Sequence, residues 1–203
     1  MRDTGRVTER DTTDPATGEL PATQAPLGPR RIALFGVVAV VALALDIVSK
    51  VLAVENLSDR LPVRLLGGAL YIQLARNPGA AFSQGTGFTI VITGLAVVIS
   101  LVILFTARRL RSRGWALALG LVLGGALGNL VDRLLRAPSP GKGHVVDWIS
   151  VFGPNGERYP IFNLADSAVC VGAVIIVILA LRGVGLDGRR AEKTPKNPKT
   201  PTS

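Results

Sequence analysis

The sequence predicts an all-α membrane protein with four transmembrane helices and a small β-sheet outside the bilayer. Four segments of the 203-residue chain have close to the length of a membrane-spanning helix, which needs about 20 mostly apolar residues. Only 18% of the residues are charged, whereas soluble domains carry roughly 25%. Too little polar sequence remains to cover four apolar helices in water, so we interpret the chain as a multi-pass membrane protein.

The predicted spans cover residues 32–54, 88–107, 115–135 and 161–181. Asp46 and Lys50 are the only charged residues of the first span, and the second span has none. The third span is uncharged until it reaches Asp132 and Arg133, and the fourth is interrupted only by Asp166. Each segment is therefore compatible with a helix that crosses a bilayer.

Arginines predict the orientation of these spans. They gather before the first span, between the second and third spans, and after the fourth. Four crossings put these three groups on one side, which the positive-inside rule makes cytoplasmic. We therefore expect both termini inside and residues 55–87 and 136–160 outside. On this interpretation the net charge of +9 reports membrane topology and not nucleic-acid binding.

Two polar tails flank the predicted membrane domain, which covers residues 32–182. Residues 1–31 combine Pro and Thr with balanced charges, and residues 183–203 are basic and rich in Lys, Pro and Thr. Such compositions bury too little apolar surface to fold, so both tails are predicted to be disordered.

The two outer segments differ in pattern. Residues 70–76 alternate Leu and Ile with less apolar residues, which predicts a strand. Turn-forming residues stand on both sides of it, at 67–68 and 77–79. Residues 136–160 contain several Gly and Pro, so we expect a loop there.

Ionisable side chains within the spans are costly in a membrane and mark candidate functional positions. Asp46 and Lys50 are four residues apart and can pair on one helix face. They form either a neutralised structural pair or a device that positions a catalytic or substrate group. Asn129, Asp132 and Arg133 also share a helix face, as a structural polar network or as part of a site.

Asp147 and Asp166 are predicted to lie at the same outer level of the membrane. No basic residue is close enough in sequence to pair with either of them by helix spacing. Two neighbouring carboxylates cannot both ionise at low cost, so they share a proton. Such a dyad can act as a base toward water and as an acid toward a scissile carbonyl. A proton or cation relay, with Asp46 and Asp132 as further members, fits the same residue types.

The signatures of other hydrolases are missing. The sequence has neither a Gly-x-Ser-x-Gly nor a His-Glu-x-x-His motif, and His144 is its only histidine. One His and one Cys leave too few ligands for a zinc site, so we expect neither a metal nor a cofactor.

Five motifs, taken together, resemble the bacterial lipoprotein signal peptidases, also called type II signal peptidases. The motifs are DIVSK at 46–50, NPGAAFS at 77–83, GGALGNLVDR at 124–133, VVDW at 145–148 and FNLADSA at 162–168. Each motif alone is weak, but the five occur in this order, and the resemblance covers residues 32–181. Pro78 and Trp148 depart from the family, in which Thr and Phe are common at these positions.

The resemblance implies a four-helix aspartyl endopeptidase of the bacterial inner membrane, with its active site on the outer side. The substrates would be prolipoproteins with a diacylglyceryl group on the lipobox cysteine, cleaved just before that cysteine. Asp147 and Asp166 would be catalytic, and Asn129, Arg133 and Asn163 would line the substrate backbone or support the dyad. The other matching polar residues are Asp46, Lys50, Asn77 and Asp132. The resemblance also implies contact with membrane lipids and inhibition by globomycin-type cyclic peptides.

Overall fold

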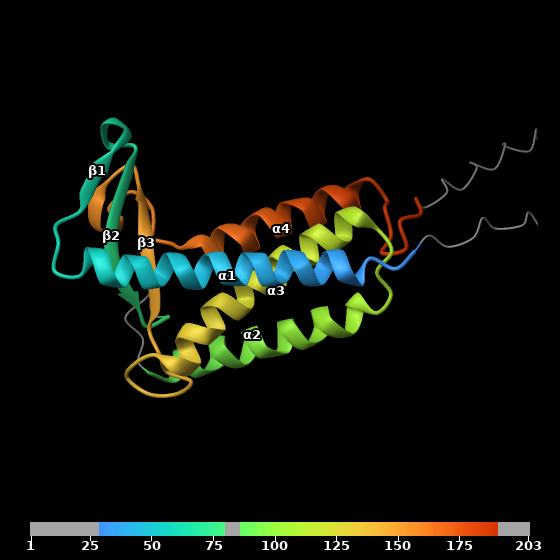
Figure 1. Ribbon diagram of the computed structural model, residues 1–203, viewed down its shortest axis with the longest axis horizontal. Coiled ribbons are helices and arrows are strands. Elements are labelled where there is room, and N and C mark those ends of the chain that lie inside the picture. Colours follow the sequence, from blue (N-terminus) through green and yellow to red (C-terminus); the bar gives the residue numbers. More distant parts are fainter. Residues whose placement is uncertain (1–28, 80–85, 191–203) are drawn as a thin grey trace, which may run out of the picture.

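Four helices and a three-stranded sheet make up the described fold (Figure 1). The computed structural model describes residues 29–79 and 86–190. The helices are α1 (Ile32–Leu57), α2 (Thr86–Ala107), α3 (Arg113–Leu135) and α4 (Leu164–Leu181). The strands are β1 (Val63–Leu65), β2 (Leu70–Asn77) and β3 (Val145–Val151). Each helix is long and apolar enough to cross a membrane, which confirms the predicted fold class.

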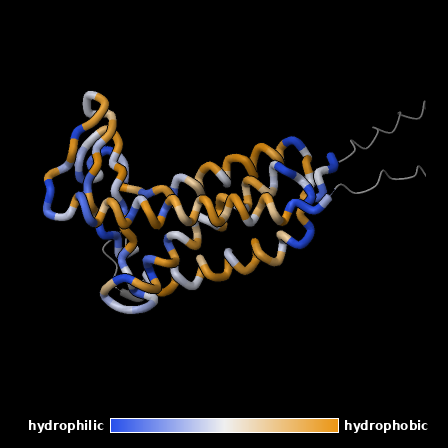
Figure 2. The backbone as a smooth tube through the Cα atoms, in the orientation of Figure 1, coloured by the Kyte–Doolittle hydropathy of each residue, from blue (hydrophilic) through white to orange (hydrophobic). Residues whose placement is uncertain are grey.

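The sheet lies at one end of the helix bundle and the two ends of the described chain lie at the other (Figure 1). Apolar residues dominate the helices between these ends, while hydrophilic residues gather at both (Figure 2). The segments that follow α1 and α3 therefore meet on the side of the sheet, as the alternation of four crossings predicts.

Helix α3 is the centre of the bundle because small residues let its neighbours come close. A Cβ added at Gly124 would lie 2.6 Å from the Ala39 carbonyl oxygen of α1. A Cβ added at Gly125 would overlap the Ala165 carbonyl oxygen of α4. Glycine is therefore required for the backbones of α1 and α4 to approach α3, as in other membrane helix pairs. Helix α2 packs mainly against α3.

The sheet is antiparallel, with β2 between β1 and β3. The predicted strand at 70–76 is confirmed by β2, which extends to Asn77. Ile72 pairs with Ile149, and Ala75 pairs with Asp147 after an irregularity in the register. This pairing brings the end of β2 beside Asp147.

The prediction of a loop at 136–160 is wrong for residues 145–151, which form β3. This segment reads VVDWISV and is rich in β-branched and aromatic residues, which favour strands. Gly and Pro on both sides concealed the pattern. The fourth helix also begins later than predicted, at Leu164 instead of residue 161, because Asn163 caps it.

The predicted tails are ordered where they meet the bundle. Arg31 donates its backbone N–H to the Leu110 carbonyl at 2.9 Å. Residues 183–190 turn back after α4, and the Leu186 carbonyl accepts the backbone N–H groups of Arg111 and Ser112. Arg31 and residues 183–190, which the sequence analysis assigns to the tails, therefore contact the bundle through backbone hydrogen bonds. The remaining tail residues, 1–28 and 191–203, and residues 80–83 of the second motif lie outside the described residues.

Candidate active site

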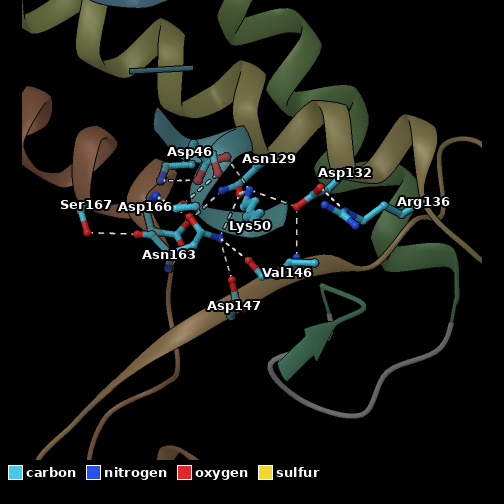
Figure 3. Close-up of polar contacts among 12 residues, drawn as sticks. Asp46, Lys50, Asn129, Asp132, Arg136, Val146, Asp147, Asn163, Asp166 and Ser167 are labelled. Carbon is cyan, nitrogen blue, oxygen red and sulfur yellow. Dashed lines mark hydrogen bonds and ion pairs between the residues drawn. The ribbon is translucent and has the colours of Figure 1, made fainter. Parts of the chain in front are cut away.

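Polar side chains from five elements converge where the bundle meets the sheet (Figure 3). This polar cluster contains Asp46 and Lys50 of α1, Asn77 of β2, Asn129, Asp132 and Arg133 of α3, Asp147 of β3, Asn163, and Asp166 of α4. These are the nine residues that the sequence analysis selects. The fold brings them together from distant parts of the chain.

Asn163 caps α4 and fixes Asp166 in the first turn of that helix. The side-chain oxygen of Asn163 accepts the Asp166 N–H at 3.0 Å, and Asp166 Oδ2 accepts the Asn163 N–H at 3.1 Å. This reciprocal arrangement is a capping box and satisfies two free N–H groups at the start of the helix. The orientation of Asp166 therefore follows from a motif four residues long.

Asn163 also connects the two aspartates. Its Nδ2 donates to Asp147 Oδ1 at 2.7 Å, while its backbone N–H holds Asp166. Because Asn163 is fully buried, these contacts are shielded from water. The two carboxylates are thus fixed relative to each other through one residue.

Asp147 lies on β3 and is only 3% exposed. Its Oδ2 accepts a hydrogen bond of 3.0 Å from Asn77 Nδ2 on β2. The pKa of Asp147 is raised to about 6, mainly by burial and in addition by the negative charge of Asp166. The hydrogen bonds from Asn77 and Asn163 act in the opposite direction, as does the charge of Lys50. Burial has the larger effect, so Asp147 retains a proton well above the usual range of aspartate.

Asn129 provides the contact between α3 and Asp166. Its Nδ2 donates to Asp166 Oδ1 at 2.8 Å. Its oxygen accepts hydrogen bonds from Lys50 Nζ at 2.9 Å and from Asn163 Nδ2 at 3.1 Å. With both donors facing its oxygen, the Asn129 amide can present only its NH₂ group to Asp166.

Lys50 is a buried cation between two carboxylates. Its Nζ lies 2.7 Å from Asp46 Oδ2 and 3.0 Å from Asp132 Oδ2. The predicted pairing of Asp46 with Lys50 is therefore confirmed, and Asp132 is a partner that sequence spacing does not indicate. All three side chains are almost fully buried, so each charge depends on the others.

The carboxylates of Asp46 and Asp132 also hold the backbone next to the two aspartates. Asp46 Oδ1 accepts the Ala165 N–H at 2.9 Å, one residue before Asp166. Asp132 Oδ2 accepts the Val146 N–H at 3.1 Å, one residue before Asp147. The ion pairs of Lys50 therefore tie together the start of α4 and the middle of β3.

Two arginines at the end of α3, one inside the helix and one that caps it, lie at the edge of this cluster. Arg136 pairs with Asp132 through Nε, a contact that the sequence analysis misses although the four-residue spacing signals it. Arg133 is 7% exposed, and its Nη1 has no hydrogen-bond partner among the described residues. A Cβ added at Gly79 would lie 2.9 Å from this Nη1. A buried donor without a partner is costly, which makes Arg133 available to an acceptor on a ligand.

The chemistry available to the cluster centres on Asp147 and Asp166. Within the described residues, neither carboxylate forms an ion pair, and no group of acidic, His or Cys side chains is suited to hold a metal. Two carboxylates that are bridged by neutral amides can exchange one proton between them and act as base and acid.

The sequence of this chain is similar to a family described as "Signal peptidase (SPase) II", which it matches over residues 38–182. It is 50% identical over 161 residues to the lipoprotein signal peptidase of Rhodococcus jostii, which covers 79% of this chain and 78% of that protein. It is 49% identical over 168 residues to the lipoprotein signal peptidase of Mycobacterium tuberculosis, which covers 82% of this chain and 81% of that protein.

The fold is similar to two solved structures of bacterial membrane enzymes. One has a TM-score of 0.66 and 26% identity, and the match covers 78% of this chain and 99% of that one. The other has a TM-score of 0.62 and 26% identity, and the match covers 84% of this chain and all of that one. All nine residues of the polar cluster lie inside the segment that matches the family.

Proposed function

Because this chain belongs to the signal peptidase II family, whose members remove signal peptides from prolipoproteins, we propose that Asp147 and Asp166 are its catalytic pair. The proposed substrate is a prolipoprotein with a diacylglyceryl group on its lipobox cysteine. Cleavage falls just before that cysteine. One observation carries the mechanism: two carboxylates, neither of them ion-paired with a described residue, are joined through Asn163.

The two carboxylates have different roles in the first step. Asp166 accepts a proton from water as the water oxygen attacks the scissile carbonyl carbon. Asp147, whose raised pKa of about 6 lets it hold a proton far above the usual range of aspartate, donates that proton to the carbonyl oxygen. In the second step Asp166 gives a proton to the leaving nitrogen, the C–N bond breaks, and Asp147 recovers its proton from the tetrahedral intermediate.

The other residues of the polar cluster support this pair. Asn129 and Asn163 orient the carboxylates, and the free Nη1 of Arg133 binds a carbonyl oxygen of the substrate backbone. Lys50, with Asp46 and Asp132, holds the backbone beside each aspartate. Asp46 and Asp132 are engaged in these ion pairs, an arrangement that favours support of a peptidase site over a proton relay.

The membrane placement follows from the charges at the two ends of the bundle. Arginine groups lie at the end opposite the sheet, as the positive-inside rule requires of a cytoplasmic side. We place both termini there, in the cytoplasm of a bacterium, and the catalytic pair at the outer surface of the inner membrane. Globomycin-type cyclic peptides compete for this same site, and no step involves nucleic acid, a metal or a cofactor.

The test uses purified full-length protein in detergent or lipid. A prolipoprotein with or without its diacylglyceryl group is added, and release of the signal peptide is followed by gel shift. The wild type should cleave the lipidated form alone, and Asp147→Asn and Asp166→Asn should each abolish cleavage. Asp59→Asn is the matched control, because Asp59 is an exposed carboxylate outside the cluster. Full activity in either dyad variant would refute the mechanism.

A further inference from the structure

Helix α2 contributes no residue to the polar cluster, yet one of its side chains holds the turn that ends β2. Thr89 lies near the start of α2 and is only 4% exposed. Its hydroxyl donates a hydrogen bond to the Pro78 carbonyl. The hydroxyls of Thr93, Ser100 and Thr106 instead donate to the carbonyl four residues earlier in the same helix, which is a common bond of hydroxyls in helices. Thr89 therefore connects α2 to a segment outside the helix.

The turn at the end of β2 fixes the amide of Asn77 toward Asp147. Asn77 Oδ1 accepts the Gly79 N–H at 2.8 Å, and Asn77 Nδ2 donates to Asp147 Oδ2 at 3.0 Å. Because the amide oxygen is engaged inside the turn, the NH₂ group is the part that faces the carboxyl. Pro78 stands between Asn77 and Gly79 and has no N–H, so its carbonyl is the one backbone group by which it can be held. The Thr89 hydroxyl binds that carbonyl.

The same turn lies against Arg133. A Cβ added at Gly79 would lie 2.9 Å from Arg133 Nη1, the donor proposed to bind the substrate backbone. The turn therefore borders both the proposed acid and the proposed substrate contact. A side chain that holds this turn can act on the reaction without touching the substrate.

We propose that Thr89 is a positioning residue for Asp147, because its hydrogen bond to Pro78 holds Asn77 against the carboxyl. This assignment rests on the proposed function. Thr89 acts through two intervening contacts, first with the backbone of the turn and then through the Asn77 amide. Helix α2 is thereby coupled to the acid, although it packs mainly against α3 and carries no residue of the polar cluster.

The charged groups that act on Asp147 belong to other helices. The charge of Asp166 on α4 raises the pKa of Asp147, and the charge of Lys50 on α1 lowers it. Arg133 on α3 also interacts with the charge of Asp147. Residues 86–107 of α2 include no charged side chain. An effect of Thr89 on the proton of Asp147 must therefore pass through the turn.

The first test is the pH profile of kcat/KM for a lipidated prolipoprotein. Thr89→Val removes the hydroxyl and keeps the branched shape of the side chain. The hydrogen bond from Asn77 lowers the pKa of Asp147, so its loss should move the fall of kcat/KM to higher pH, by roughly one pH unit or less. Thr89→Ser keeps a hydroxyl and should retain the wild-type profile. An unchanged profile in Thr89→Val would overturn the proposal.

A double variant and a matched control distinguish positioning from a general loosening of α2. Asn77→Ala already lacks the hydrogen bond to Asp147, so adding Thr89→Val should move the profile no further. Thr93→Val also removes a buried hydroxyl from α2, but that hydroxyl lies beside the Thr89 and Gly141 carbonyls. Its profile should equal that of the wild type. A further displacement in the double variant, or an equal displacement in Thr93→Val, would overturn the proposal.

A measurement without substrate keeps this proposal separate from the proposed function. If the wild type does not cleave a lipidated prolipoprotein, the proposed function itself fails. The pKa of Asp147 is still measurable in that case, from the NMR resonance of its carboxyl carbon during a pH titration. A higher pKa of Asp147 in Thr89→Val than in the wild type supports the role of Thr89, whether or not the protein cleaves. Equal pKa values in the two proteins would overturn it.

Discussion

Asp147 and Asp166 are held by two different kinds of structure. Asp147 sits on a strand, is nearly inaccessible to water, and accepts hydrogen bonds from the side chains of Asn77 and Asn163. Asp166 sits in the first turn of a helix, is half-buried beside a cavity, and accepts a backbone N–H of its own capping box. Burial at the strand position favours a protonated carboxyl, whereas the helix position fixes Asp166 through backbone and amide donors. In the proposed mechanism, this difference makes the strand carboxyl the acid and the helix carboxyl the base.

The largest expected effect is on thermal stability. It comes from removing the buried cation whose ion pairs hold the backbone beside both aspartates. Lys50→Met leaves Asp46 and Asp132 as buried carboxylates without their common cation. Breaking a buried ion pair in this way costs about 3–5 kcal/mol, so the variant should unfold at a clearly lower temperature. Thermal unfolding in detergent measures this, with Lys142→Met, outside the cluster, as the matched control. A melting temperature equal to that of the wild type would show that the ion pairs contribute nothing.

The second-largest expected effect is on kcat, and it comes from removing the side chain that links the two aspartates. Asn163→Ala removes the donor to Asp147 and the cap that orients Asp166. Loss of one positioned donor lowers kcat by roughly 10²–10³-fold in comparable sites. Single-turnover cleavage of a lipidated prolipoprotein measures the loss. Asn56→Ala is the control, because the Asn56 side chain donates to the Leu52 carbonyl of its own helix. An Asn163→Ala variant with wild-type kcat would contradict the linkage.

The smallest expected effect is on the pH dependence of kcat/KM, and it concerns the proton of Asp147. The pKa of Asp147 is raised to about 6, so Asp147 loses its proton as the pH rises through that value. If protonated Asp147 is the acid, kcat/KM falls tenfold per pH unit above about pH 6. The hydrogen bond from Asn77 lowers this pKa, so Asn77→Ala should move the fall to higher pH. A bond worth about 0.5–1.5 kcal/mol corresponds to a displacement of roughly one pH unit or less.

The pH profile of kcat/KM in the wild type and in Asn77→Ala tests this assignment. A kcat/KM that rises through about pH 6 instead, with the rise displaced to higher pH in the variant, would show that ionised Asp147 is the reactive form. The roles of acid and base would then be exchanged between the strand and the helix.

Sequence reasoning succeeds where a local rule applies. The four spans follow from length and composition, and the pairing of Asp46 with Lys50 follows from their four-residue spacing. The capping role of Asn163 is also a local pattern, although the predicted start of the fourth helix did not use it. Local rules fix which side chains share one element, and they place Asp166 in the first turn of its helix.

The remaining contacts of the polar cluster join different helices and strands, and the spacing of residues in the sequence does not reveal such contacts. Lys50 reaches Asp132 because α1 and α3 approach closely, and Asn77 reaches Asp147 because β2 pairs with a strand that the sequence analysis took for a loop. The ordered turn at 183–190 is held by backbone groups of residues 111–112. The polar composition of residues 183–190 does not predict these backbone contacts.

The glycine contacts of α3 also determine which parts of the molecule can move relative to each other. At Gly124 and Gly125 the backbones of α1 and α4 lie against α3 with no side chain between them. Sliding either helix would press backbone atoms together, and closely packed backbone has no room to deform gradually. Helices α1, α3 and α4 therefore behave as one rigid frame. Displacements that admit a substrate therefore fall to α2, which packs mainly against α3, so slow motions measured by hydrogen exchange should concentrate there and not in the frame.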